Sequence, residues 1–160
     1  MSDNLPSTMA DNYEYAGFWI RVGASVLDTI LVLLITIPLS MMVYGSAFLE
    51  SDQIVLGPAD VAINYILPFV AVMAFWIYKA ATPGKMAVKA IIVDAKTGQP
   101  MTRVQCVIRY FAYLVAMLPL FIGLIWVAWD SKKQGWHDKI AGTVVIRRKA
   151  ADTESVEFSG

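Results

Sequence analysis

The chain has 160 residues, of which 58% are hydrophobic and 16% are charged, and its mean hydropathy is +0.57. Soluble domains usually carry about 25% charged residues, so the composition argues against a soluble multidomain enzyme. The formal net charge of +0 at pH 7 and the lack of a basic segment with interleaved aromatic residues argue against a nucleic-acid partner. The single cysteine, Cys106, excludes a disulfide framework and a CxxC redox pair.

Three long apolar segments, residues 22–44, 61–78 and 110–129, together contain one charged residue, Asp28. Segments of about 18 apolar residues or more are long enough to cross the hydrocarbon core of a bilayer. Nothing basic precedes Arg21, and the first segment exceeds the apolar region of a signal peptide, so we expect it to remain as a span. The sequence therefore predicts a multi-pass integral membrane protein that contacts the lipid bilayer.

In chain order, residues 1–13 form an acidic tail, and the first span follows from about Phe18 to Tyr44. The next loop, 45–60, holds three acidic residues and no Lys or Arg. Pro68 lies in the middle of the second span. We expect it to kink this helix, because proline removes a backbone hydrogen bond and clashes with the preceding turn.

Two short strands are predicted outside the apolar segments. Residues 89–94 and 142–147 are rich in β-branched residues, which favour strands. If both lie on the cytoplasmic face, they can pair there. The membrane domain then extends over residues 14–148, and residues 149–160 form a polar C-terminal tail.

A helix is expected to begin at about Arg103 and to run into the third apolar segment. Thr102 and Gln105 have the spacing of a capping box, which satisfies two free N–H groups at a helix start. Within residues 118–123 a proline and a glycine interrupt the helical pattern. Residues 104–129 can therefore span the membrane once or turn back as a re-entrant hairpin.

The distribution of Lys and Arg favours the hairpin. The positive-inside rule places loops rich in these residues in the cytoplasm; the first loop has none and residues 79–109 have six. A single crossing by residues 104–129 would leave seven Lys and Arg inside and six outside, whereas a hairpin places all 13 inside. We therefore expect an all-α membrane protein with two transmembrane helices, a Pro-broken re-entrant hairpin (or third span) and a small cytoplasmic strand pair. It would lie in the cell (inner) membrane with both termini cytoplasmic.

Charged residues at and inside the first span are the main candidates for function. Arg21 and Asp28 are seven residues apart, so they share one helix face and lie about 10 Å apart along its axis. A carboxylate inside a bilayer costs about 2.5–3.5 kcal/mol on insertion scales. Asp28 is therefore either a structural pairing group or a carboxylate that binds a proton or a cation.

The separation of Arg21 from Asp28 makes a direct ion pair geometrically poor, so each should pair with another element of the chain. The expected partners are Asp130 or Asp138 for Arg21, and Asn64, Tyr65 or the broken hairpin for Asp28.

His137 precedes Asp138 in the polar segment after the third apolar segment. With no second His or Cys nearby, we expect no metal ligand here. We find no nucleophile–base arrangement either, so no catalytic residue, enzymatic activity or cofactor is expected. The candidate site for an ion or proton, or for structural polar contacts, consists of Arg21, Asp28, Asp130, His137 and Asp138.

Several segments together resemble the RDD family of membrane proteins, which is named for one Arg and two Asp residues. They are AGFWIR at 16–21 followed by Asp28, ATPGK at 81–85, Arg109-Tyr110, Trp129-Asp130 and GWHDKIAGT at 135–143. Arg21 and Asp28 match the first two letters of the name, and both Asp130 and Asp138 fit the third. The resemblance covers about residues 14–148.

The resemblance implies two kinds of function. Some members of the family are associated with sodium/proton antiport, and others with membrane complexes that include proteases or quality-control machinery. We therefore expect either a Na⁺ or H⁺ transporter (or a subunit of one) or a non-catalytic scaffold or accessory subunit of a membrane complex. Because two spans and a hairpin enclose no pathway alone, we also expect a homo-oligomer or a membrane partner protein.

Overall fold

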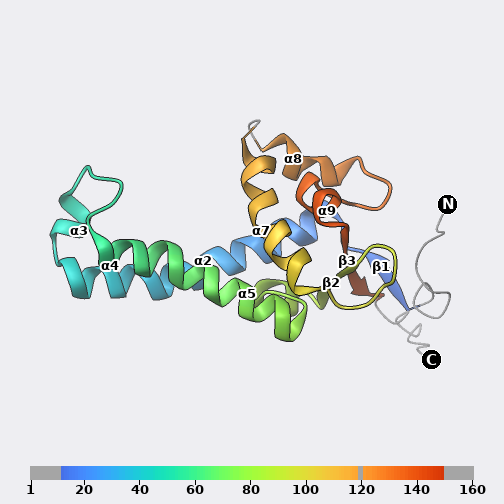
Figure 1. Cartoon of the computed structure of the whole chain (residues 1–160), viewed down its shortest axis with the longest axis horizontal. Helices are drawn as coiled ribbons and strands as arrows, with labels where there is room; N and C mark the ends of the chain where they lie inside the picture. The colour runs from blue at the N-terminus through green and yellow to red at the C-terminus, as the bar shows by residue number, and fades with distance from the viewer. Residues whose placement is uncertain (1–11, 119–120, 150–160) are drawn as a thin grey trace, which may run out of the picture.

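A computed structural model describes residues 12–118 and 121–149, so the expected tails lie outside the described residues except at residues 12, 13 and 149. The elements in chain order are β1 (Tyr13–Tyr15), α2 (Phe18–Tyr44), α3 (Ala47–Glu50), α4 (Pro58–Val61), the π-helix η1 (Ala62–Ile66), α5 (Leu67–Lys79), α6 (Pro83–Ala87), β2 (Ala90–Asp94), α7 (Arg103–Met117), α8 (Ile122–Ile125), the 3-10 helix η2 (Trp126–Ala128), α9 (Trp136–Ala141) and β3 (Thr143–Arg148). Figure 1 shows a mostly helical molecule with a small sheet at one end and α3 at the other.

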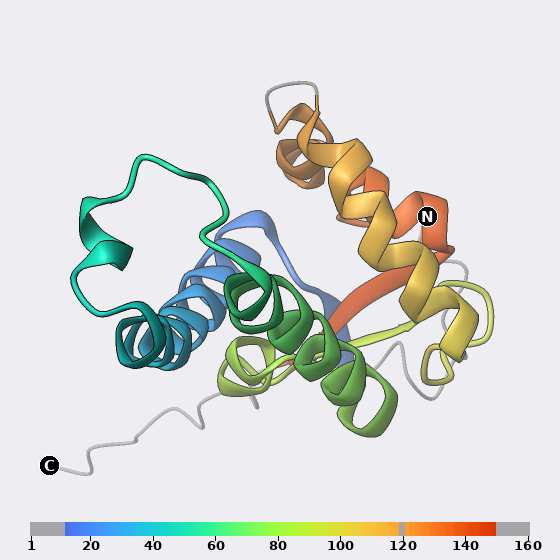
Figure 2. The ribbon, with the colours of Figure 1, turned by 60° about the vertical axis from the view of Figure 1, so that its left-hand side comes forward.

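Within the described residues, two helices are long and apolar enough to cross a membrane: α2, with 27 residues, and the continuous helical segment Pro58–Lys79, with 22. At 1.5 Å per residue they measure about 40 and 33 Å, against a hydrocarbon core of about 30 Å. In the most apolar window of each, only 11% of the residues are buried inside the protein. The two segments lie side by side in both views (Figures 1 and 2). Both predicted spans are therefore confirmed as long apolar helices.

The expected irregularity at Pro68 is a change of helix type. The π-helix η1 ends at Ile66, and α5 begins at Leu67 with Pro68 in its first turn. Proline cannot donate the backbone hydrogen bond that an α-helix requires. A short π-helical turn is a common way for a helix to absorb such a break, so the second span continues through Pro68.

The two predicted strands are part of a larger sheet than we expected. In the described residues three strands form an antiparallel sheet in the order β1-β3-β2. The additional strand, β1, pairs Tyr15 with Ile146, and its tyrosines pack against a small cluster of Val93, Val144 and Ile146. The predicted pairing is confirmed as β2 with β3, and the sheet has one strand more than the pair that we expected. Three residues are too few for a period-2 pattern to separate a strand from a polar tail.

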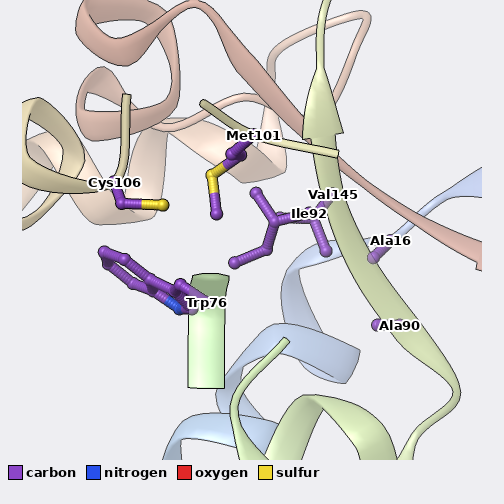
Figure 3. Packing of buried hydrophobic residues seen from close by; sticks show 7 residues of the cluster. All are labelled: Ala16, Trp76, Ala90, Ile92, Met101, Cys106 and Val145. Atoms are coloured by element: carbon purple, nitrogen blue, oxygen red, sulfur yellow. The ribbon is translucent and has the colours of Figure 1, made fainter. Parts of the chain in front are cut away.

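The main apolar core joins the second span to this sheet (Figure 3). Its members come from α5, α7, the sheet and the segments that lead into α2 and α7: Ala16, Trp76, Ala90, Ile92, Met101, Cys106 and Val145. Cys106 is fully buried here as a free thiol, as a small apolar side chain would be. This core fixes where the end of α5 and the start of α7 lie relative to the sheet.

The third apolar segment is bent rather than straight. Helix α7 begins at Arg103, and both hydrogen bonds of the predicted capping box between Thr102 and Gln105 are present. The helical segments Arg103–Met117 and Ile122–Ala128 are bent by 115° to each other. A Cβ atom at Gly123 would lie 2.8 Å from the Cα atom of Ala116, so glycine is needed for this close return. The predicted interruption is confirmed; whether the segment turns back within the membrane stays a prediction.

Candidate functional site

Asp138 is the centre of a buried ion-pair network. It lies in the first turn of α9 and is 0% exposed. Its Oδ2 atom accepts a hydrogen bond of 2.5 Å from Nη1 of Arg21 and one of 2.9 Å from the N–H of Gly135. Its Oδ1 atom contacts Nη1 of Arg109. One carboxylate therefore links the first span, α7 and α9.

Arg21 is fixed by three directed contacts on its guanidinium group. Besides the bond to Asp138, its Nε donates to the carbonyl oxygen of Ala16 at 3.0 Å, and its Nη2 donates to the carbonyl oxygen of Lys133 at 2.6 Å. Each of the three guanidinium nitrogens donates one of these hydrogen bonds. The Arg21 side chain thus ties the first turn of α2 to the loop before α9, as an arginine fork can.

Arg109 is the residue of this network that the sequence analysis did not place. It is 0% exposed within α7 and donates to Oγ1 of Thr143 at the start of β3. Its guanidinium carbon lies 5.6 Å from the ring centre of Trp76 and 5.8 Å from that of Tyr113, within cation–π range. The sequence feature that could have identified Arg109 is its position as a charged residue in an apolar helix, because a charge there is rarely left without a partner.

Burial and the neighbouring charges determine the ionisation of the Asp138 carboxyl group and of the His137 imidazole. Burial would raise the pKa of Asp138, but the guanidinium groups of Arg109 and Arg21 outweigh it and hold that pKa well below its usual range. Burial, together with the same two cations, lowers the pKa of His137 to about 3 despite the adjacent carboxylate. His137 is therefore neutral at pH 7, and its Nε2, 3.4 Å from Asp138, is not part of an ion pair. Its ring stacks on that of Tyr113 with centroids 4.0 Å apart.

Asp28 forms a second, separate polar site. Its Oδ1 accepts a 2.6 Å hydrogen bond from the N–H of Gly84, and its Oδ2 accepts one from the hydroxyl of Thr82. A Cβ atom at Gly84 would lie 2.0 Å from the carbonyl oxygen of Ala24, so glycine alone permits this approach of α6 to α2.

The expected partners of Asp28 were wrong. Asn64 instead donates to Oγ of Ser40 at 3.1 Å and to Oδ1 of Asp60 at 2.6 Å, towards the other end of the two spans. The segment after the second span returns to the level of Asp28 and supplies its donors. Spacing within one helix could not reveal which later segment would return there.

Asp130 lies outside the Asp138 network. It forms an ion pair of 2.5 Å with Lys139 and accepts backbone hydrogen bonds from Lys132 at 3.1 Å and Gln134 at 3.0 Å. Burial opposes its ionisation, but Lys139 and these N–H groups outweigh burial and lower its pKa. Of the two alternatives for Arg21, the structure brings Asp138 to it.

Of the five candidate residues, the structure therefore joins Arg21, His137 and Asp138 and places Asp28 and Asp130 elsewhere. In the parts of the chain that the structure describes, no three His, Cys, Asp or Glu side chains are grouped so that they could hold a metal ion. The chemistry of the Asp138 network is that of a buried, charge-compensated junction between helices. Asp28 differs because it lines a cavity of about 410 Å³ between α2, α5 and α7.

The sequence comparisons point to one family. The RDD family model matches residues 15–142. The chain is 44% identical over 75 residues to an uncharacterised protein of Rickettsia prowazekii, which is 47% of this chain and 41% of that relative. It is 35% identical over 63 residues to a proline-rich antigen homologue of Mycobacterium tuberculosis, which is 39% of this chain and 26% of that relative.

A third relative matches over more of its length: an uncharacterised protein of Bacillus subtilis is 27% identical over 146 residues, 82% of this chain and 96% of that relative. The chain thus covers less than half the length of the first two relatives. No solved structure shows a significant match to the chain.

Proposed function

Since the chain belongs to the RDD family of membrane proteins, we propose that it is a non-catalytic scaffold or accessory subunit of a complex in the cell membrane. The Asp138 network carries this proposal. Its charged groups bond to one another across α2, α7 and α9. A carboxylate between two guanidinium groups, with a strongly lowered pKa, stays ionised at neutral pH and holds elements together rather than exchanging protons.

The surface of the two spans supports a partner. Large apolar side chains of α2 are widely exposed, among them Leu34 at 66% and Met42 at 83%. Lipid covers such a surface, and so does another transmembrane helix, which gains packing contacts there. We propose that part of this surface binds either a second copy of the chain or a membrane partner protein.

Photo-crosslinking in native membranes tests this role. A photoreactive residue at Leu34 should give a discrete adduct of defined mass, and the same residue at exposed Gln53, in the loop after α3, should not. The Leu34 adduct should weaken in an Arg21→Ala variant compared at equal protein level, because α2 loses its attachment to α9. Absence of an adduct along α2 and α5 would count against a scaffold.

One observation favours transport of Na⁺ or H⁺ as a second candidate. Asp28 is a carboxylate on the wall of a cavity between spans, and Thr29 lines the same cavity. Carboxylates in such positions form proton and cation sites in transporters. An oligomer would then have to complete the pathway, because two spans and a hairpin do not enclose a pathway alone.

Proteoliposomes of pure protein distinguish the two roles. A transporter should move Na⁺ against an imposed pH gradient. Asp28→Asn should abolish this flux, because the amide has nearly the same shape but cannot titrate. Asp52→Asn, at an exposed loop position, is the matched control and should keep it. A scaffold should give no flux in any of the three proteins.

A further inference from the structure

Lys85 is a buried lysine for which the described residues supply no counter-ion. It lies in α6 next to Gly84 and is 6% exposed. No side chain or carbonyl among residues 12–118 and 121–149 forms an ion pair or hydrogen bond with its ammonium group. The other buried cation of the described chain, Arg109, is paired with Asp138. The ammonium nitrogen is not among the fully buried unpartnered polar atoms, so it faces a space that another molecule can enter.

Two adjoining cavities meet at Lys85. The smaller, of about 370 Å³, lies between α2, the α8–η2 segment and α9, and the larger, of about 410 Å³, lies between α2, α5 and α7. Lys85, Ser25 and Thr29 line both. Each volume falls within the range of about 300–1,000 Å³ that is typical of small-molecule sites.

The two cavities differ in charge. Arg21, Lys85 and His137 line the smaller cavity, and no acidic side chain does so. Asp28 lines the larger cavity, where it would repel an anion. The rest of that wall is mainly apolar, with side chains such as Val32 from α2. An amphiphile with a negative group in the smaller cavity and a hydrocarbon chain in the larger one fits both.

The hydrogen-bond donors that remain free identify the contact atoms. Arg21 already uses three of its five N–H donors within the protein, and it adds its positive charge to the smaller cavity. The Thr29 hydroxyl donates to the carbonyl oxygen of Ser25 at 2.9 Å. The ammonium of Lys85 and the hydroxyl of Ser25 line the smaller cavity and form no hydrogen bond with the described residues, and both suit phosphate oxygens.

We propose that Lys85 marks a binding site for one anionic phospholipid. Its phosphate contacts Lys85 and Ser25 in the smaller cavity, and one acyl chain lies along the apolar wall of the larger cavity. The cytoplasmic leaflet supplies anionic headgroups, and basic pockets between transmembrane helices on that side bind them. A soluble phosphate would leave the apolar wall unused, so the lipid is the preferred source of the anion.

Lipid titration of the full-length protein in detergent tests the site. Phosphatidylglycerol should raise the midpoint of thermal unfolding, since a ligand that binds only the native state stabilises it, and native mass spectrometry should show one retained lipid. Phosphatidylcholine or inorganic phosphate at equal concentration should shift the midpoint little. Equal shifts with phosphatidylcholine would refute headgroup selection, and an equal shift with phosphate alone would refute a lipid site.

Lys85→Met is the informative variant, because methionine keeps the length of the side chain and removes the charge. The affinity for phosphatidylglycerol should fall about tenfold or more, which corresponds to the loss of one charge-assisted contact. The lipid-free midpoint should stay the same or rise, because the ammonium group of Lys85 forms no ion pair or hydrogen bond with the described residues that the substitution could break. Lys85→Arg should retain lipid binding.

The matched control is Lys79→Met, at an exposed position in the last turn of α5. It should bind phosphatidylglycerol like the wild type. Equal losses in the Lys79 and Lys85 variants would mean general charge attraction and would overturn the proposal. A lipid-free midpoint that falls in Lys85→Met would show a purely structural cation and would overturn it too.

Discussion

Asp138 connects three helices of this small protein through a single carboxylate. Its two oxygens face two arginines that are 117 and 29 residues earlier in the chain, one in α2 and one in α7. Removing one member of a buried ion pair is more damaging than replacing all of it, because the remaining charge keeps its desolvation cost.

Asp138→Asn should therefore lower the free energy of unfolding by about 3–5 kcal/mol, the range for breaking a buried pair. The amide keeps the shape but leaves the two guanidinium groups without a negative partner. Thermal unfolding in detergent and the yield of folded protein measure this. Asp52→Asn, the same chemical change at an exposed position, should stay within about 0.5 kcal/mol of wild type.

His137 should make the protein less stable in mild acid. Its pKa is about 3 in the fold and about 6.5 when unfolded, so the unfolded chain binds a proton that the folded chain does not. The stabilisation is complete above pH 6.5 and is lost as the pH falls from 6.5 towards 3. The charged groups that face His137 are Asp138, Arg109, Arg21 and Lys85, and burial together with the three cations outweighs the carboxylate in lowering the pKa of His137.

Unfolding midpoints of wild type and His137→Phe between pH 7.5 and 5 check this expectation, with the pH limits chosen roughly around the ordinary pKa of histidine. Phenylalanine keeps the ring stacked on Tyr113 and cannot titrate. The midpoint of the variant should depend less on pH. Parallel curves for the two proteins would show that His137 is not the cause.

At the scale of elements, the approach of α6 to α2 depends on the missing side chain of Gly84. Helix α6 is short, yet it brings Thr82 and Gly84 to Asp28 and holds Lys85 between the spans. The backbone of α2 at Ala24 leaves no room for a larger residue there. The packing of α6 is therefore a backbone-to-backbone contact, closed by the Asp28 carboxylate.

Gly84→Ala should separate α6 from α2 and break the hydrogen bond from its N–H to Asp28. We expect a loss of about 2–4 kcal/mol, typical of overpacking combined with a buried carboxylate that loses a donor. Gly23→Ala is the control, since nothing lies within 4 Å of its added Cβ atom and alanine favours a helix. A Gly84→Ala variant as stable as Gly23→Ala would contradict the packing described.

The success of prediction from sequence depended on how local each interaction is. The two spans and the Thr102–Gln105 cap follow from hydropathy and from a spacing of three residues, so both could be predicted. For Arg21, the sequence limited the expected partner to Asp130 or Asp138. Both acids lie in the polar segment after the third apolar segment, which was expected at the same membrane interface as Arg21. The donors of Asp28 and the strand Tyr13–Tyr15 depend on which distant segments meet, and no pattern in a single sequence reports that.

At the scale of the whole molecule, the arrangement of charge fits one orientation in the membrane. The loop between the two spans carries no Lys or Arg, and it lies at the end of the molecule opposite the sheet (Figure 1). The sheet end carries the basic residues of β3 and of the loop before α9. We expect this end to face the cytoplasm by the positive-inside rule.

Labelling of single cysteines tests this topology. In whole cells, a membrane-impermeant maleimide should label Gln53→Cys, in the loop between the spans, and should not label Ser131→Cys, in the loop before α9. Both positions are exposed, whereas the native Cys106 is fully buried and should remain silent. Labelling of Ser131→Cys from outside would show that residues 104–129 cross the membrane and would refute the hairpin.

The position of β3 has a consequence for biosynthesis. This strand occupies the middle of the sheet although it comes last among the described elements, and Asp138 leaves the ribosome 117 residues after Arg21. At a synthesis rate of about 5–20 residues per second, Asp138 is therefore added to the chain roughly 6–23 s after Arg21. During that interval the first span is inserted with an unmatched arginine and the strands β1 and β2 have nothing between them. A nascent chain arrested in this interval should be a ready substrate for membrane proteolysis, and release of β3 should end that vulnerability.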